Sequence, residues 1–100
     1  TGHILENIIY FELLRRGYDV AIGKLDHKEV DFIATKTDEK KYIQVTESMT
    51  SPETRKRELS PLQKIPDNYE KIVIAMDTGL EQDRDGIKLI NAIDFLLEEV

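Results

Sequence analysis

The sequence predicts an α/β fold with a single mixed sheet whose two faces are both covered by helices. Three observations support this: a helical apolar repeat at residues 3–16, strand-like alternation between residues 18 and 46, and a nearly continuous apolar run at residues 71–76. Because helices come before and after the strand-rich middle, both faces of the sheet can be covered. With 100 residues, 40% of them hydrophobic, the chain has the length and core material of one domain.

The first half of the chain predicts one helix followed by three strands. Residues 3–16 have apolar side chains at helical spacing and few polar ones, which indicates a well-buried helix that ends in a left-handed cap at Gly17. A polar loop typical of a hairpin separates the last two strands. The strands are expected at residues 18–22, 29–36 and 42–46.

A second helix is predicted to begin after Ser51, which is a favourable N-cap, with Pro52 in the first helical position. Its apolar repeat continues to Ile65. Pro61 lies inside this repeat and lacks the backbone N–H that a helix interior uses. We therefore expect a kink or a restart of the helix at Ser60.

The last third of the chain predicts two strands and a final helix. The apolar run at residues 71–76 is typical of a strand that is covered on both faces. A short strand is expected at residues 87–90, followed by a helix that Asn91 caps. The predicted order is therefore α-β-β-β-α-β followed by β-α. The last helix is expected to bury an apolar stripe of Ile93, Leu96, Leu97 and Val100.

Composition and charge narrow the classes of function. With 20 Asp and Glu against 14 Lys and Arg, the net charge of −6 argues against tight nucleic-acid binding through global charge. No stretch of about 18 apolar residues occurs, so no membrane partner is expected. The absence of Cys excludes disulfides and thiolate metal sites and fits a reducing cytoplasm, the expected location. Because the sequence starts at Thr1 without Met, we expect it to be part of a longer polypeptide.

Three polar side chains of the predicted hairpin are expected to share one face. A loop of even length would pair Asp31 with Thr46 and Ile33 with Gln44, which brings Asp31, Gln44 and Thr46 together. An odd loop or a bulge would break this arrangement. The opposite face would then carry Val30, Phe32, Ile43 and Val45.

Two interpretations of this polar face remain open. Asp31, Gln44 and Thr46 can be the solvated side of a half-exposed hairpin, which is common in antiparallel sheets. The alternative comes from Glu6, one of few polar positions in the first helix. Burying that helix would leave an unpaired carboxylate at a high cost, which favours a partner or a metal ion.

Short segments of the first half resemble the opening of the PD-(D/E)XK nuclease superfamily in order and spacing: GHILEN (2–7), LLRRGYDV (13–20), EVDFI (29–33) and YIQVT (42–46). More narrowly, the chain is similar to the DUF4143 domain, found at the C-terminus of predicted bacterial and archaeal AAA+-type P-loop ATPases. Residues 71–77 and 85–96 are similar to the C-terminal half of that family. The resemblance covers nearly the whole chain.

The resemblance implies a restriction-endonuclease-like core and a role for each polar position. In the superfamily, a helix Glu and a strand Asp hold Mg²⁺, and a second acid precedes a Lys by two residues. Glu6 and Asp31 match the first two positions, whereas Gln44 replaces the second acid and Thr46 replaces the Lys. The implied metal ligands are Asp31, Glu6 and Gln44, with Mg²⁺ bound weakly through the neutral carbonyl of Gln44.

The two departures predict a degenerate site with little or no nuclease activity. Thr46 cannot supply a cation to the developing negative charge, and losing such help typically costs on the order of 10²–10³ in rate. Lys24 is the candidate substitute, without strong support. The resemblance also implies that residues 1–100 form one C-terminal domain whose partner is the ATPase core of the same polypeptide. ATP would bind only in that other part, because this chain has no phosphate-binding glycine loop.

The basic cluster at the start of the second helix, Arg55, Lys56 and Arg57, is a candidate contact for DNA, together with Lys24. Its alternative is a solvated helix face balanced by neighbouring glutamates. Three functions therefore stay open: a decayed nuclease-like module that binds nucleic acid or a partner, a weakly active Mg²⁺-dependent DNA nuclease, and a scaffold for oligomerisation or docking.

Overall fold

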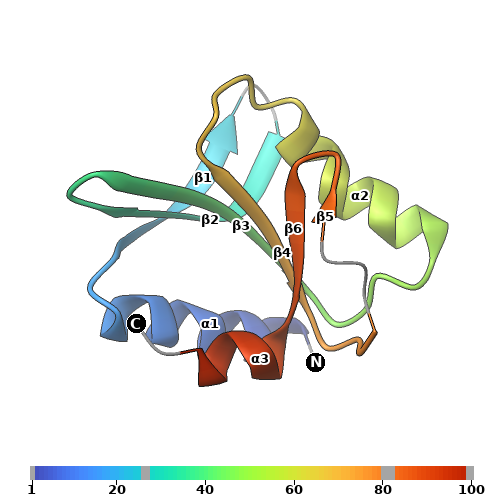
Figure 1. Ribbon diagram of the computed structural model, residues 1–100, viewed down its shortest axis with the longest axis horizontal. Helices are drawn as coiled ribbons and strands as arrows, with labels where there is room; N and C mark the ends of the chain where they lie inside the picture. Colours follow the sequence, from blue (N-terminus) through green and yellow to red (C-terminus); the bar gives the residue numbers. More distant parts are fainter. Residues whose placement is uncertain (1, 26–27, 80–82, 99–100) are drawn as a thin grey trace.

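The computed structural model describes residues 2–25, 28–79 and 83–98, which form one six-stranded sheet between helices (Figure 1). In chain order the elements are α1 (Gly2–Arg15), β1 (Asp19–Leu25), β2 (Lys28–Lys36), β3 (Glu39–Thr46), α2 (Pro52–Gln63), β4 (Glu70–Ala75), β5 (Asp83–Arg84), β6 (Ile87–Asn91) and α3 (Ala92–Leu97). The strands lie in the order β1-β2-β3-β4-β6-β5. The pairs β3–β4 and β4–β6 are parallel and the others antiparallel, so the predicted mixed sheet is confirmed.

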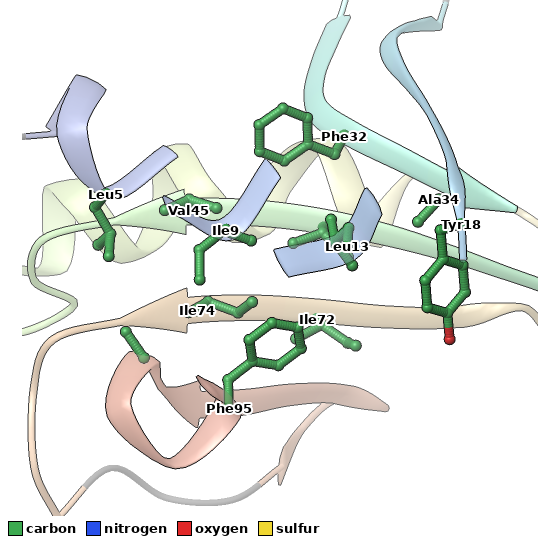
Figure 2. Close-up of a cluster of buried hydrophobic side chains, with 12 residues drawn as sticks. Leu5, Ile9, Leu13, Tyr18, Phe32, Ala34, Val45, Ile72, Ile74 and Phe95 are labelled. Atoms are coloured by element: carbon green, nitrogen blue, oxygen red, sulfur yellow. The ribbon is translucent and has the colours of Figure 1, made fainter. Parts of the chain in front are cut away.

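Helices cover both faces of the sheet, as expected: α1 and α3 lie on one face and α2 on the other (Figure 1). The cluster beneath α1 and α3, shown in Figure 2, joins side chains of both helices to β2, β3 and β4. The strand β4 contributes to both clusters. Ile72 and Ile74 pack toward α1 and α3, whereas Val73 and Ala75 pack toward α2. This confirms that the apolar run in the sequence is a strand buried on both sides.

Only one stripe of α1 is buried, so the prediction of a well-buried helix was wrong. Leu5, Ile9 and Leu13, four residues apart, are at most 8% exposed. The other large apolar side chains of the helix face away from the sheet, because no further layer of the described residues covers that side. They are Ile4, Ile8, Phe11 and Leu14.

The predicted cap at the end of α1 is present. Gly17 has a φ of 91°, and its N–H donates to the carbonyl of Leu14 at 3.0 Å. The N–H of Tyr18 donates to the carbonyl of Leu13 at 3.1 Å. These two bonds form the glycine cap that commonly ends helices, and Tyr18 and Leu13 are both members of the buried cluster.

Arg16 ties the end of α1 to the end of α3. Its Nη2 donates to the carbonyls of Phe95 (2.6 Å) and Glu98 (3.2 Å) at the end of α3, where the Phe95 carbonyl also accepts the N–H of Glu98 at 3.3 Å. Its guanidinium lies 4.3 Å from the centre of the Phe95 ring, and its Nε donates to Glu12. Hydrogen bonds from Arg15 and Arg16 lower the pKa of Glu12 to about 2.

The second helix begins as predicted. The Ser51 hydroxyl accepts a hydrogen bond from the N–H of Thr54 at 3.0 Å, and Pro52 is the first helical residue. The helix continues through Pro61 to Gln63 as one element, so no restart occurs at Ser60.

The last helix has the predicted cap and a different buried stripe. Asn91 Oδ1 accepts hydrogen bonds from the N–H groups of Ile93 and Asp94. Ala92 and Phe95 are the buried side chains, and Leu96 is half-buried against the same cluster as expected, whereas Ile93 and Leu97 are exposed, which corrects the predicted stripe. The stripe differs because Arg16 and the sheet select the side of α3 that carries Phe95. Val100 lies outside the described residues.

The register of the β2–β3 hairpin differs from the expected one. The turn consists of residues 37–38, and Ile33 pairs with Tyr42 instead of Gln44. Regular pairing ends at Phe32 and Ile43, so Asp31 comes level with Gln44 and not with Thr46. A shift of two residues keeps the same side chains on the same face.

A bulge in β2 changes which face Val30 occupies. The pairing of β1 and β2 shifts by one residue between Ala21–Ile33 and Gly23–Val30, so two residues of β2 oppose one residue of β1. Val30 therefore packs in the cluster under α2, and not with Phe32 as the alternation predicted. The extra residue lies at Asp31 and Phe32, next to the candidate site.

We expect Gly23→Ala to lower the free energy of unfolding by about 1–3 kcal/mol, the usual cost of overpacking. An added Cβ at Gly23 would lie 2.8 Å from Cγ1 and Cδ1 of Ile33 and 3.3 Å from Cβ of Val30. Urea denaturation checks this. Ile33→Val in the same background removes Cδ1 and should recover part of the loss; a Gly23→Ala variant as stable as the parent contradicts the packing.

Candidate functional site

Asp31 and Gln44 exchange hydrogen bonds between their side chains and the neighbouring backbone. The N–H of Asp31 donates to Gln44 Oε1 at 2.8 Å, and the N–H of Val45 donates to Asp31 Oδ2 at 2.8 Å. Both bonds form where the regular pairing of β2 and β3 ends. The two side chains therefore satisfy backbone groups that the bulge leaves without a ladder partner.

Gln44 extends this connection to α2. Its Nε2 donates to the backbone carbonyl of Glu58 at 3.2 Å, and the residue is only 4% exposed. Both polar ends of the side chain thus have protein partners. A buried amide satisfied in this way joins β2, β3 and α2 and is costly to remove.

The expected metal ligands are arranged as a hydrogen-bonded network. The carbonyl oxygen of Gln44, predicted as a ligand, accepts the N–H of Asp31, and one oxygen of Asp31 accepts the N–H of Val45. Within residues 2–25, 28–79 and 83–98, no group of three or more His, Cys, Asp or Glu side chains could hold a metal ion. The expected set of Glu6, Asp31 and Gln44 contains two carboxylates and one amide, and Mg²⁺ binding by these three residues stays a prediction.

Asp31 and Glu58 are carboxylates whose pKa values are raised by burial and by neighbouring acids. Burial raises the pKa of Asp31, and the charges of Glu6 on α1 and Glu29 on β2 raise it further, against the hydrogen bond from Val45. Burial also raises the pKa of Glu58 on α2, and the charges of Asp31 and Glu6 add to this. The bulge in β2 thus lies in a negative region to which α1, β2 and α2 all contribute.

Glu58 is the residue that the sequence did not point out. It was expected only as one of the charges that balance the basic cluster, yet its side chain is 13% exposed. The signal lay in helical spacing, because position 58 is four residues before the buried Leu62 and seven before Ile65. A carboxylate on that stripe must face the sheet.

Among the described side chains that pair with these acids, none is a lysine that takes the place of the one missing at Thr46. Thr46 is half-buried, and its hydroxyl donates to the carbonyl of Ser48 at 3.4 Å. The described ion-pair partners of Glu6 and Glu58 are His3, at 4.0 Å, and Arg57, at 3.5 Å. The side chain of Lys24, the candidate substitute, lies outside the described residues.

The basic cluster lies on α2 beside Glu58. Arg55 is half-buried, whereas Lys56 and Arg57 are exposed and line a shallow depression together with Pro61. Arg57 is also the ion-pair partner of Glu58. Both interpretations that the sequence left open therefore fit this side of α2. Lys56 and Arg57 are accessible basic side chains, and the charge of Arg57 is balanced by Glu58.

The comparisons with known proteins leave the family open. No family model matches the chain. It is 49% identical over 94 residues to an uncharacterized protein of Haemophilus influenzae. The match covers 94% of this chain and 23% of that protein, so the chain spans about a quarter of the relative's length. Within the described residues, no helix has the length and apolar character needed to cross a membrane.

We expect Asp31→Asn and Asp31→Ala to have different effects on stability at pH 7. The amide oxygen of Asn can still accept the N–H of Val45. The substitution also removes a charge that burial and Glu6 disfavour, so the variant should be at least as stable as the parent. Ala leaves the N–H of Val45 without this partner and should cost about 1–3 kcal/mol. Urea denaturation of the three proteins checks this; equal losses in both variants contradict the proposed role of Asp31 in the strand pairing.

We expect Glu58→Gln to stabilise the chain at pH 7 and not at pH 4. The pKa of Glu58 is higher in the folded than in the unfolded chain, so its contribution favours folding at low pH and is lost as pH rises through the folded pKa. The difference between variant and parent, measured by denaturation from pH 4 to 8, should therefore grow with pH. In an Asp31→Asn background the gain should shrink, since one repelling charge is gone; a pH-independent difference contradicts the assignment.

Proposed function

We propose that this chain is a nuclease-like domain of a longer ATPase whose catalytic site has decayed, and that it acts as a binding or regulatory module. The observation that carries the proposal is the state of Gln44. It occupies the position that the resemblance gives to the second catalytic acid, yet it is buried and both ends of its amide are hydrogen-bonded within the protein. A side chain committed to holding β2, β3 and α2 together is not free to bind a reacting group.

The charges around Asp31 support the same proposal. Phosphodiester cleavage builds negative charge that a nuclease must neutralise with cations. Here Thr46 replaces the lysine that the resemblance implies, and its hydroxyl is engaged with Ser48. Burial and the charges of Glu6 and Glu29 raise the pKa of Asp31, which is the opposite of what an adjacent cation would do.

The partner in this proposal is the rest of the polypeptide. The Haemophilus influenzae relative has most of its length outside the matched region. The resemblance to DUF4143 implies that the other part is an ATPase core, which would bind ATP. The lack of Cys supports a cytoplasmic location for the whole.

A second candidate function, a weak Mg²⁺-dependent DNA nuclease, is favoured by one observation. Glu58 brings a third carboxylate into the region of Glu6 and Asp31 and could replace the charge that Gln44 lacks. Arg55, Lys56 and Arg57 lie on the same helix as Glu58 and offer cations to a phosphate backbone.

A cleavage assay with single-stranded, duplex and branched DNA, in Mg²⁺ or Mn²⁺, separates the two functions. We expect no turnover above that of an Asp31→Ala sample prepared in the same way. Metal-dependent cleavage that disappears in both Asp31→Asn and Glu58→Gln would establish the second function and overturn the first. Asp31→Asn is the informative variant, because it is expected to leave the fold intact.

A further inference from the structure

The side of α1 that faces away from the sheet is an apolar surface. The α1 outer face consists of Ile4, Ile8, Phe11 and Leu14, which are 62, 43, 65 and 41% exposed. The positions 4, 8 and 11 follow one another at helical spacing, opposite the buried stripe. In a chain of this size, a cluster of large exposed side chains along one helix marks an interaction surface more often than chance exposure does.

The polar residues beside the α1 outer face favour a protein over a nucleic acid as its partner. The chain carries a net charge of −6. At the end of the helix, Arg15 and Arg16 donate hydrogen bonds of 2.6–2.9 Å to Glu12. Arg15 is thereby already paired. With no free cation presented by the described part of α1, a phosphate backbone would find little to bind.

The area of the α1 outer face indicates whether its partner is a second copy of this chain or a covalently attached domain. Four half-exposed side chains on a helix of 14 residues offer on the order of a few hundred Å². A stable complex of free proteins usually buries roughly 800 Å² on each partner. A small apolar contact is sufficient only when the partner is covalently attached, because the tether supplies a high effective concentration.

We infer that the α1 outer face docks against another part of the same longer polypeptide, through an apolar surface of that part. The inference rests on the proposed function in one respect, namely that the chain is one domain of a longer protein. Its support is the relative of Haemophilus influenzae, in which the matched region makes up 23% of the length. Ile93 and Leu97 of α3 are exposed on the same layer and extend the apolar character of that side.

Hydroxyl-radical footprinting of the 100-residue chain and of the full polypeptide that contains it tests the inference. Ile8 and Phe11 should be oxidised readily in the isolated chain and several-fold less in the full polypeptide. Tyr69, which is 49% exposed at the start of β4, should be oxidised equally in both. Equal oxidation of Phe11 in both forms overturns the inference.

Two charge substitutions provide a matched comparison. Ile8→Glu should restore the oxidation of Phe11 in the full polypeptide, whereas Tyr69→Glu, at a similarly exposed position, should not. Both side chains lie outside the core, so circular dichroism and the unfolding midpoint of the isolated variants should match the parent; Phe11→Ser is the second variant if Ile8→Glu fails to fold. Restoration by neither outer-face variant overturns the inference.

Binding of a second copy of the chain to the α1 outer face is the alternative outcome, and sedimentation tests it. If the isolated chain sediments as a dimer at micromolar concentration and Ile8→Glu makes it monomeric, the occupant is another copy and the inference is wrong. Failure of the docking inference is distinguishable from failure of the proposed function. Protection of α1 is measured without DNA, whereas nuclease activity that depends on Asp31 would overturn the degenerate site and leave the docking result as it stands.

Discussion

The pair of hydrogen bonds that joins Asp31 to Gln44 and to Val45 is the interaction on which the middle of this fold depends. It closes β2 against β3 at the point where a bulge interrupts regular pairing. It also fixes α2, because the same amide donates to the carbonyl of Glu58. The bulge turns Val30 toward α2, so the packing beneath that helix and the strand connection arise from one irregularity. Replacing either polar side chain affects both.

The same interaction limits the chemistry that the site can perform. Polar groups that satisfy a buried backbone are no longer available to a ligand unless another group takes their place. Asp31 and Gln44 are used in this way, and burial together with the charges of Glu6 and Glu29 raises the pKa of Asp31. Structural and catalytic demands on these positions conflict, and in this chain the hydrogen bonds satisfy the structural demand. This is the physical basis for proposing that the domain binds a partner and does not cleave DNA.

The two helical layers of the domain differ in how they meet the exterior. The outer side of α2 is polar and carries the basic cluster, whereas the outer side of α1 carries apolar side chains. A sheet needs only one stripe from each helix to cover it, so the rest of α1 has no role in the core of this domain. The excess apolar surface is explained if this side packs against another part of a longer polypeptide, and the matched region makes up 23% of the length of the relative.

The sequence by itself determined the types and order of the three helices and of the five longer strands, and three of the residues that cap the helices. Gly17, Ser51 and Asn91 could be assigned from the sequence because capping involves bonds between residues within a few positions. The burial of β4 on both faces was also readable, since its apolar run admits no solvated side. The short strand β5 was not predicted, because two residues are too few to show a period.

The tertiary structure alone decided the register, the bulge and the environment of Glu58. Pairing across β2 and β3 depends on which of several near-equal alignments packs best, and alternation cannot choose between shifts of two residues. Whether α1 is covered on one side or all round depends on how many layers surround it, which its own periodicity does not report. Local bonds and periodic patterns are encoded in neighbouring residues; contacts between distant segments, such as Asp31 with Gln44 and Glu58, exist only once the whole sheet has formed.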